Sequence, residues 1–219
     1  MVFGNHLKES MQDTLMKADG VAVIFIGIAG ASSKMLVIKG GTIDTTGTMM
    51  MIISLSLGAI VGEMLDLDGK MIHFGEWLKI KTGNAKDKKF VDGFVTASLT
   101  VCIGAMAVVG SIEDGIHADH SILFAKAILD FVIILVMSAT LGKGCLFSFV
   151  PVGLFQGTIT LLASLISPFI TASAMSALSY IGSILIFCVG VNLVFNTKIR
   201  VANLLPALIV ACICTVFPL

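Results

Sequence analysis

Long apolar stretches recur along the whole chain of 219 residues, and they constrain its fold more than any other feature. A helix needs roughly 20 mostly apolar residues to cross the hydrocarbon of a bilayer, and these stretches reach or approach that length. The sequence therefore predicts an all-α, polytopic transmembrane helix bundle with about seven spans in a single integral membrane domain. The candidate spans cover residues 14–31, 49–65, 92–111, 121–141, 145–166, 177–196 and 199–219.

The composition excludes a soluble globular domain. The mean hydropathy is +1.03, and only 13% of the residues are charged, which is too few to cover a polar surface. The formal net charge is zero, so no nucleic-acid footprint is expected. The five cysteines lie in or beside apolar stretches, and we interpret them as small apolar side chains. We expect no cofactor, no metal and no enzymatic activity.

Basic residues are distributed unequally between alternate loops. If all seven stretches span the membrane, one side receives only Lys34, Lys39 and Lys126, while the other receives the remaining eleven lysines and arginines. Cytoplasmic loops carry such an excess. The pattern predicts a bacterial cytoplasmic (inner) membrane protein with its N-terminus inside and its C-terminus outside. It also favours a true first span, despite Lys17 and Asp19 within it, over a re-entrant or shortened helix, because losing one span would invert every later loop.

The long loop between the second and third stretches predicts an amphipathic helix over residues 69–82. Its large apolar side chains fall near one helical face, with the chain's one tryptophan among them: Met71, Phe74, Trp77 and Leu78. Such a helix suits the headgroup plane of a membrane, where a tryptophan acts as an anchor.

Two glycine-centred segments suggest an internal repeat. VCIGAM around Gly104 and FCVGVN around Gly190 share a local pattern, and each lies in the middle span of three. Spans two to four and five to seven would then be two three-helix units. Because three is odd, the units would enter the membrane from opposite sides, as in transporters with inverted repeats. A glycine in apolar surroundings also recurs by chance, so both readings stay open.

Ionisable and amide side chains inside the apolar stretches are the candidates for function, because an unpaired charge at mid-membrane is strongly unfavourable. Asp130 lies near the middle of its stretch, and Lys126 shares its helical face one turn earlier, at the i,i+4 spacing of an ion pair. Gln156 lies in the next stretch, after the tight hairpin expected over residues 142–144. We expect these two helices to pack antiparallel and to turn Asp130 and Gln156 toward each other.

Further polar residues lie near the cytoplasmic ends of the last two stretches, namely Asn192, Arg200 and Asn203. Pro206 and Pro151 predict helix kinks, and a kink at Pro206 would free a backbone carbonyl. One reading is a polar path for a small solute or ion, with Asp130 as a proton carrier, lined by Asp130, Lys126, Gln156, Asn192, Arg200 and Asn203. The other reading is a structural ion pair, interhelical amide hydrogen bonds and a snorkelling arginine.

Several segments match one bacterial family in amino-acid sequence and in their order along the chain. They are LSLGAIVGEMLDLDGKM, FVDGFVTASLTVCIGAMAVVGSIEDG, DHSILFAKAILD, SATLGKG, FQGTITLLAS and KIRVANLLPAL, and the match runs from about His6 onward. In these segments the chain resembles the domain-of-unknown-function 554 family of YdfK/YqgA-like bacterial membrane proteins. The resemblance implies a multi-spanning inner-membrane protein. It assigns no chemistry to the matching residues, which include Asp130, Lys126, Gln156, Asn192, Asn203 and Pro206. Members of that family usually begin with another apolar span, so this chain is expected to be one helix shorter.

Two functional hypotheses follow from these patterns. The first is a small-solute or ion transporter or channel with a polar path in spans four to seven. The second is a non-transporting membrane scaffold or accessory subunit that packs against a partner. The expected partners are the lipid bilayer, an unidentified small solute or ion, and further copies of the chain in a homo-oligomer.

Overall fold

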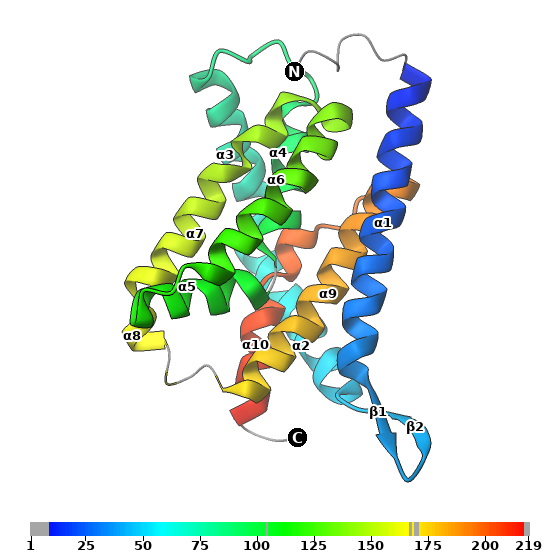
Figure 1. The fold of residues 1–219 in the computed structure, drawn as a ribbon. Coiled ribbons are helices and arrows are strands. Elements are labelled where there is room, and N and C mark those ends of the chain that lie inside the picture. The colour runs from blue at the N-terminus through cyan, green and yellow to red at the C-terminus, as the bar shows by residue number, and fades with distance from the viewer. Residues whose placement is uncertain (1–8, 104, 167, 169–170, 217–219) are drawn as a thin grey trace.

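The computed structural model describes residues 9–103, 105–166, 168 and 171–216, which form a bundle of helices with one small hairpin (Figure 1). In chain order the elements are α1 (Glu9–Met35), β1 (Leu36–Lys39), β2 (Thr42–Thr45), α2 (Thr48–Leu65), α3 (Leu67–Lys81), α4 (Phe90–Cys102), α5 (Ala105–His117), α6 (Ser121–Leu141), η2 (Lys143–Ser148), α7 (Phe149–Leu161), α8 (Ala163–Ile166), α9 (Ala172–Phe195), η4 (Val201–Leu204) and α10 (Pro206–Val216).

Within the described residues, five helical segments are long and apolar enough to cross a membrane. They are α1, α2, α6, the η2–α7 segment and α9, and the bent pair α4–α5 makes six if it counts as one span. The weak first stretch is thus confirmed as a helix of sufficient length. The η4–α10 segment is apolar but shorter, so the count of seven spans stays a prediction.

The β1–β2 hairpin is a departure from the predicted all-α fold. Its strands are rich in β-branched residues and pair antiparallel, with Lys39 opposite Thr42. Gly40 and Gly41 between them have φ angles of 58° and 82°, which a two-residue hairpin turn requires and which glycine adopts without steric strain.

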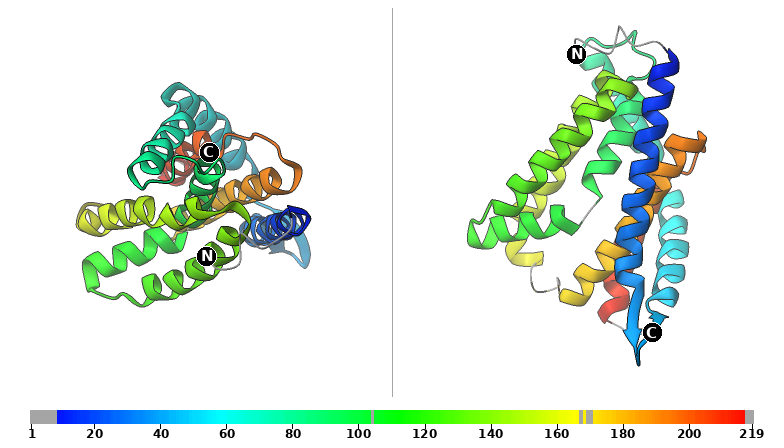
Figure 2. Two further views of the ribbon diagram at one scale, coloured as in Figure 1. Left: turned by 90° about the horizontal axis from the view of Figure 1, so that it is seen from above. Right: turned by 45° about the vertical axis from the view of Figure 1, so that its right-hand side comes forward.

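Glycines bring the central helices into close contact. A Cβ atom placed on Gly27 of α1 would lie 2.6 Å from the backbone nitrogen of Phe187 on α9, and one on Gly62 of α2 would lie 1.8 Å from the carbonyl oxygen of Asn203. Apolar side chains gain little by leaving lipid for one another, so membrane helices associate largely through such close packing. Figure 2 shows α1 running beside α9 along most of its length.

The predicted pairing of α6 with α7 is wrong. The segment after α6 is not a bare hairpin but the 3₁₀ helix η2, which packs closely on α4. A Cβ on Gly144 of η2 would lie 1.8 Å from the carbonyl oxygen of Phe90, so only glycine fits there. With η2 anchored on α4, both α6 and α7 pack on α4 and α5 rather than on each other.

The two predicted proline kinks are also wrong. Pro206 is the first residue of α10, separated from the end of η4 by one residue, and Pro151 lies in the first turn of α7. The backbone N–H groups in the first turn of a helix have no acceptor within the helix, so the missing N–H of proline breaks no hydrogen bond there. The fixed φ angle of proline also matches the helical conformation. Both prolines therefore begin helices instead of bending them.

The inverted repeat is not confirmed. In the first proposed unit the middle span is broken, because the axes of α4 and α5 are bent by 63°. The middle span of the second unit is α9, a continuous helix of 24 residues.

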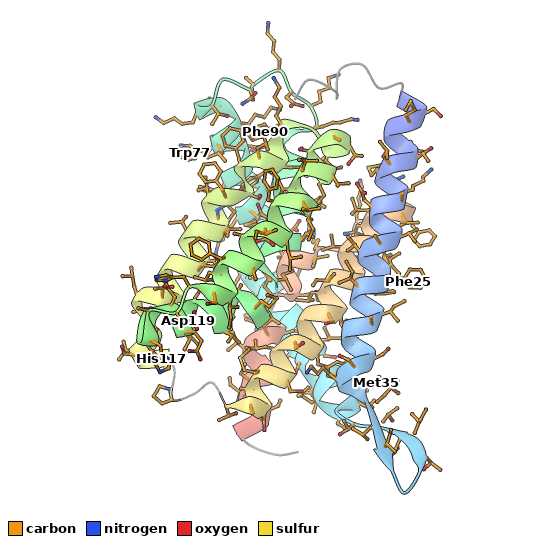
Figure 3. All side chains as sticks on the ribbon, in the orientation of Figure 1. Phe25, Met35, Trp77, Phe90, His117 and Asp119 are labelled. Carbon is orange, nitrogen blue, oxygen red and sulfur yellow. The ribbon has the colours of Figure 1, made fainter. Side chains whose placement is uncertain are left out.

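The predicted helix over residues 69–82 is present as α3. It packs against α4 through Leu78, which is buried with Phe90 and Phe94. Its placement in the headgroup plane stays a prediction. Figure 3 shows Trp77 toward one end of the bundle, His117 and Asp119 toward the other, and Phe25 pointing away from the helices.

Close packing at Gly62 leads to a stability prediction. Gly62→Ala should destabilise the purified protein by about 1–3 kcal/mol, because the new methyl group overlaps backbone atoms that cannot move independently. Gly157→Ala on α7 is the matched control, since a Cβ there meets nothing within 4 Å. The control should be neutral or slightly stabilising. Thermal unfolding in detergent measures both, and equal melting temperatures for the two variants would contradict the close contact between α2 and η4.

Candidate functional site

The break between α4 and α5 exposes backbone groups within an apolar bundle. Helix α4 ends at Cys102, and Ile103 takes an extended conformation with φ −81° and ψ 108°. The last carbonyls of a helix lack partners four residues ahead. In a soluble protein water would satisfy them, but inside a bilayer the protein itself must supply the donors.

Lys126 of α6 supplies one of these donors. Its Nζ donates a hydrogen bond to the carbonyl oxygen of Val101 at 2.8 Å. The same ammonium group pairs with the carboxylate of Asp130 one turn further along α6, as the i,i+4 spacing predicted. The Lys126 side chain is 7% exposed and that of Asp130 is 21% exposed, so the charge pair lies largely within the protein.

The charges of Lys126 and Asp130 are favourably placed relative to the end of α4. A cation lies at the carboxyl end of α4, where the helix dipole is negative, and a carboxylate balances its charge. An ammonium group has three N–H donors, of which the Val101 carbonyl and Asp130 account for two. The site can therefore hold a proton on Asp130, or exchange the Lys126–Asp130 contact for a contact with another polar or charged group.

Arg200 and Asn203 belong to a different cluster, which joins the α2–α3 corner to the segment before α10. Glu63 accepts from Nη1 of Arg200 at 2.6 Å and from Nδ2 of Asn203 at 2.5 Å. The amide oxygen of Asn203 accepts from the backbone N–H of Asp68 at 2.7 Å. These bonds fasten the two segments together, so Arg200 and Asn203 have structural partners.

Asn192 closes the loop that follows α9. Its Oδ1 accepts from the backbone N–H of Ile199 at 3.0 Å and from the hydroxyl of Thr197 at 2.7 Å, while its Nδ2 donates to the carbonyl of Ile199 at 2.8 Å. The amide is thus fully engaged with its own loop. The six residues predicted as one polar path are therefore divided among separate groups.

Gln156 stands apart from the other candidates. It lies on α7, a helix without a buried residue, between Gly153 and Gly157. A Cβ on either glycine would meet nothing within 4 Å. Among the described residues the Gln156 amide has no hydrogen-bond partner, and α7 does not bring it to the Lys126–Asp130 pair.

Asp19 is a candidate that the sequence reasoning did not select. It lies on α1 next to Gly20, which packs on Leu193 and Val194 of α9. Its Oδ2 atom is buried and has no hydrogen-bond partner among the described residues. The signal was present as an acidic residue within an apolar stretch, where the sequence analysis considered Asp19 only as a residue that weakens the first span.

These features define a multi-spanning membrane protein with an ion pair at a broken helix. Comparison with known proteins gives its family: the profile described as "Protein of unknown function (DUF554)" matches residues 1–216, and the chain belongs to this family. The family resemblance seen in the sequence is thereby confirmed.

Two relatives cover almost the whole chain. It is 27% identical over 210 residues to the "Uncharacterized membrane protein YdfK" of Bacillus subtilis (strain 168), a match that covers 95% of this chain and 85% of the relative. It is 26% identical over 214 residues to the "Uncharacterized protein YqgA" of Escherichia coli (strain K12), covering 96% and 86% of the two chains. No solved structure gives a significant match.

The Lys126–Asp130 pair leads to a double-mutant prediction. Asp130→Ala should destabilise the protein by about 3–5 kcal/mol, because it leaves a buried ammonium group without its counter-charge. Combining it with Lys126→Met should recover only part of this loss, because the unpaired charge is removed but the Val101 carbonyl also loses its donor. Melting temperatures of the two variants measure the effect, and a double variant no more stable than Asp130→Ala would show that the two side chains are not coupled.

Proposed function

We propose that this protein is a small-solute or ion transporter or channel, not an enzyme, and that its polar path passes the break between α4 and α5. The observation that carries the proposal is the Lys126–Asp130 pair bound to the Val101 carbonyl at that break. Broken helices and intramembrane charges are the features from which membrane transporters build ion and solute sites.

The placement of the path differs from the sequence prediction. Spans four to seven correspond to α6, the η2–α7 segment, α9 and η4–α10, and the polar residues on the last of these serve the α2–α3 corner. The proposed path instead uses α4, α5 and α6, together with α1, which packs on α6 and carries the unpartnered Asp19 oxygen.

The Lys126–Asp130 ion pair is suited to exchanging one of its partners for an incoming group. A bare charge at mid-membrane is unfavourable by several kcal/mol, so the Lys126–Asp130 contact opens only when an incoming group replaces one partner. A proton on Asp130 or a solute with its own polar group meets this condition. The pair would then admit matching groups and stay closed without them.

Flux measurements test the proposal. Wild-type protein in liposomes should carry a saturable flux in a panel of protons, Na⁺, K⁺, chloride, phosphate, succinate and neutral amino acids, read by entrapped pH dye and by electrical currents. Asp130→Asn keeps the size and an oxygen that can still accept from Lys126, so it should lose less stability than Asp130→Ala and stay folded. Because it removes the charge, it should lose the flux. Asp13→Asn is the control, because it removes an exposed acid of α1 that pairs with Lys17. Full flux in Asp130→Asn would remove Asp130 from the mechanism.

We further propose that the protein lies in the bacterial cytoplasmic membrane with its N-terminus inside and its C-terminus outside, as the lysine distribution indicates. Alkaline phosphatase fused to the C-terminus should then be active in intact cells, whereas a fusion in the lysine-rich loop after α3 should be inactive. The reverse pattern of activities would contradict this orientation.

A scaffold or accessory subunit is the alternative function, and one observation favours it. Helix α7 presents two open glycines beside the amide of Gln156, a combination that suits a second membrane helix. A stable complex that depends on Gly153 and Gly157, without flux in any arm of the panel, would support a scaffold or a homo-oligomer instead of a transporter.

A further inference from the structure

A pocket of about 240 Å³ is lined by residues at one end of the bundle. This is the end that carries the β1–β2 hairpin (Figure 1). The pocket lies where α1 and α10 end and where α2 and α9 begin. This end is opposite the lysine-rich loop after α3 and is the predicted outer end. Six polar residues contribute to its lining: Lys34, Thr46, Ser173, Ser176, Tyr180 and Thr215.

The pocket lining carries a positive charge and no negative one. Lys34 is its charged residue, and no acidic side chain belongs to the lining. Among the described residues, the Lys34 ammonium has neither a hydrogen bond nor an ion pair. Asp44 on the nearby hairpin accepts instead from the backbone N–H of Thr45 at 2.8 Å. A cation without a counter-charge in a concave site favours a negatively charged ligand.

Backbone groups add to this positive character. Helix α2 begins at the pocket with Gly47 as its N-cap and without a side-chain cap, so its first N–H groups lack an internal partner. Helix α9 begins there too, after its cap residue Thr171. The starts of these two helices carry partial positive charge.

The remaining walls suit an oxyanion of several atoms. Serine and threonine hydroxyls can donate hydrogen bonds to it, and Lys34 provides charge-assisted bonds. Tyr180 is 2% exposed and forms a rigid wall, with its ring 3.3 Å from the position of a Cβ on Gly47. The volume is well beyond the room that a single water needs.

We propose that this pocket binds a small soluble oxyanion, a carboxylate or a phosphate, from the predicted outer side. Lys34 provides the charge, and the hydroxyls of Ser173 and Ser176 provide donors, while the Thr215 hydroxyl already donates to the Cys212 carbonyl at 2.7 Å. The site is distinct from the Lys126–Asp130 pair, and binding there does not depend on transport.

Tyr180 provides a site-specific probe, because it is the only tyrosine of the chain. Protein labelled with 3-fluorotyrosine should give a single ¹⁹F resonance that reports on the pocket. In a neutral maltoside detergent, titration with sodium succinate or inorganic phosphate should shift this resonance saturably, and neutral succinamide should not. The two titrations distinguish an organic from an inorganic oxyanion.

Three variants sharpen the test. Lys34→Gln should weaken binding at least about tenfold, as expected for a charge-assisted bond, while Lys86→Gln, which removes an exposed lysine from the loop after α3, should leave it unchanged. Ser176→Leu keeps the charge but fills the pocket, so it should also prevent binding. A wild-type resonance that responds to neither anion, binding that survives Lys34→Gln, or a response only to anionic phospholipid in nanodiscs would each overturn the proposal.

Discussion

A polypeptide that interrupts a helix inside a bilayer must supply its own hydrogen-bond donors, and the centre of this protein is organised around that requirement. Lys126 donates to the Val101 carbonyl where α4 ends, and Asp130 balances the charge that this donor brings. The break allows α5 to turn by 63° and to pack with α6, α7 and α8. A straight span through residues 92–111 would place none of these contacts where they are, so the packing of α5 depends on the break that Lys126 helps to satisfy.

Glycines have the complementary role in the other half. The α1–α9 and α2–α10 contacts are close because Gly27 and Gly58 lie against the backbone atoms of Phe187 and Ala207. Helices that approach so closely gain dispersion contacts, which matter more in lipid than in water because burial from lipid contributes little. The same helices surround the pocket at the hairpin end, so its shape depends on this packing.

Hydropathy and lysine distribution were sufficient to predict the helical membrane fold, including α1 with its charged first turns. The i,i+4 spacing was sufficient for the Lys126–Asp130 pair, because both residues lie on one helix. Contacts between helices were not predictable in this way. The packing of η2 on α4 depends on the fit of Gly144 against Phe90. The hydrogen-bond partner of Arg200 and Asn203 is Glu63, about 140 residues earlier in the chain. Periodicity describes which face a residue occupies, but not which helix covers that face.

The two polar sites use different helices, and this limits how they can communicate. The ion pair lies among α4, α5 and α6, whereas the outer pocket lies among α1, α2, α9 and α10. Helix α1 packs on both α9 and α6, and α9 also contacts α4 and α5. The α1–α9 contact connects the helices of the two sites; there the glycines leave little space, and a buried oxygen of Asp19 has no hydrogen-bond partner within the described part of the chain. Beside these glycines, Val23 of α1 is buried with Leu185, Val189 and Leu193 of α9, so the α1–α9 contact is closed by both backbone and side-chain packing, and the two sites remain separate.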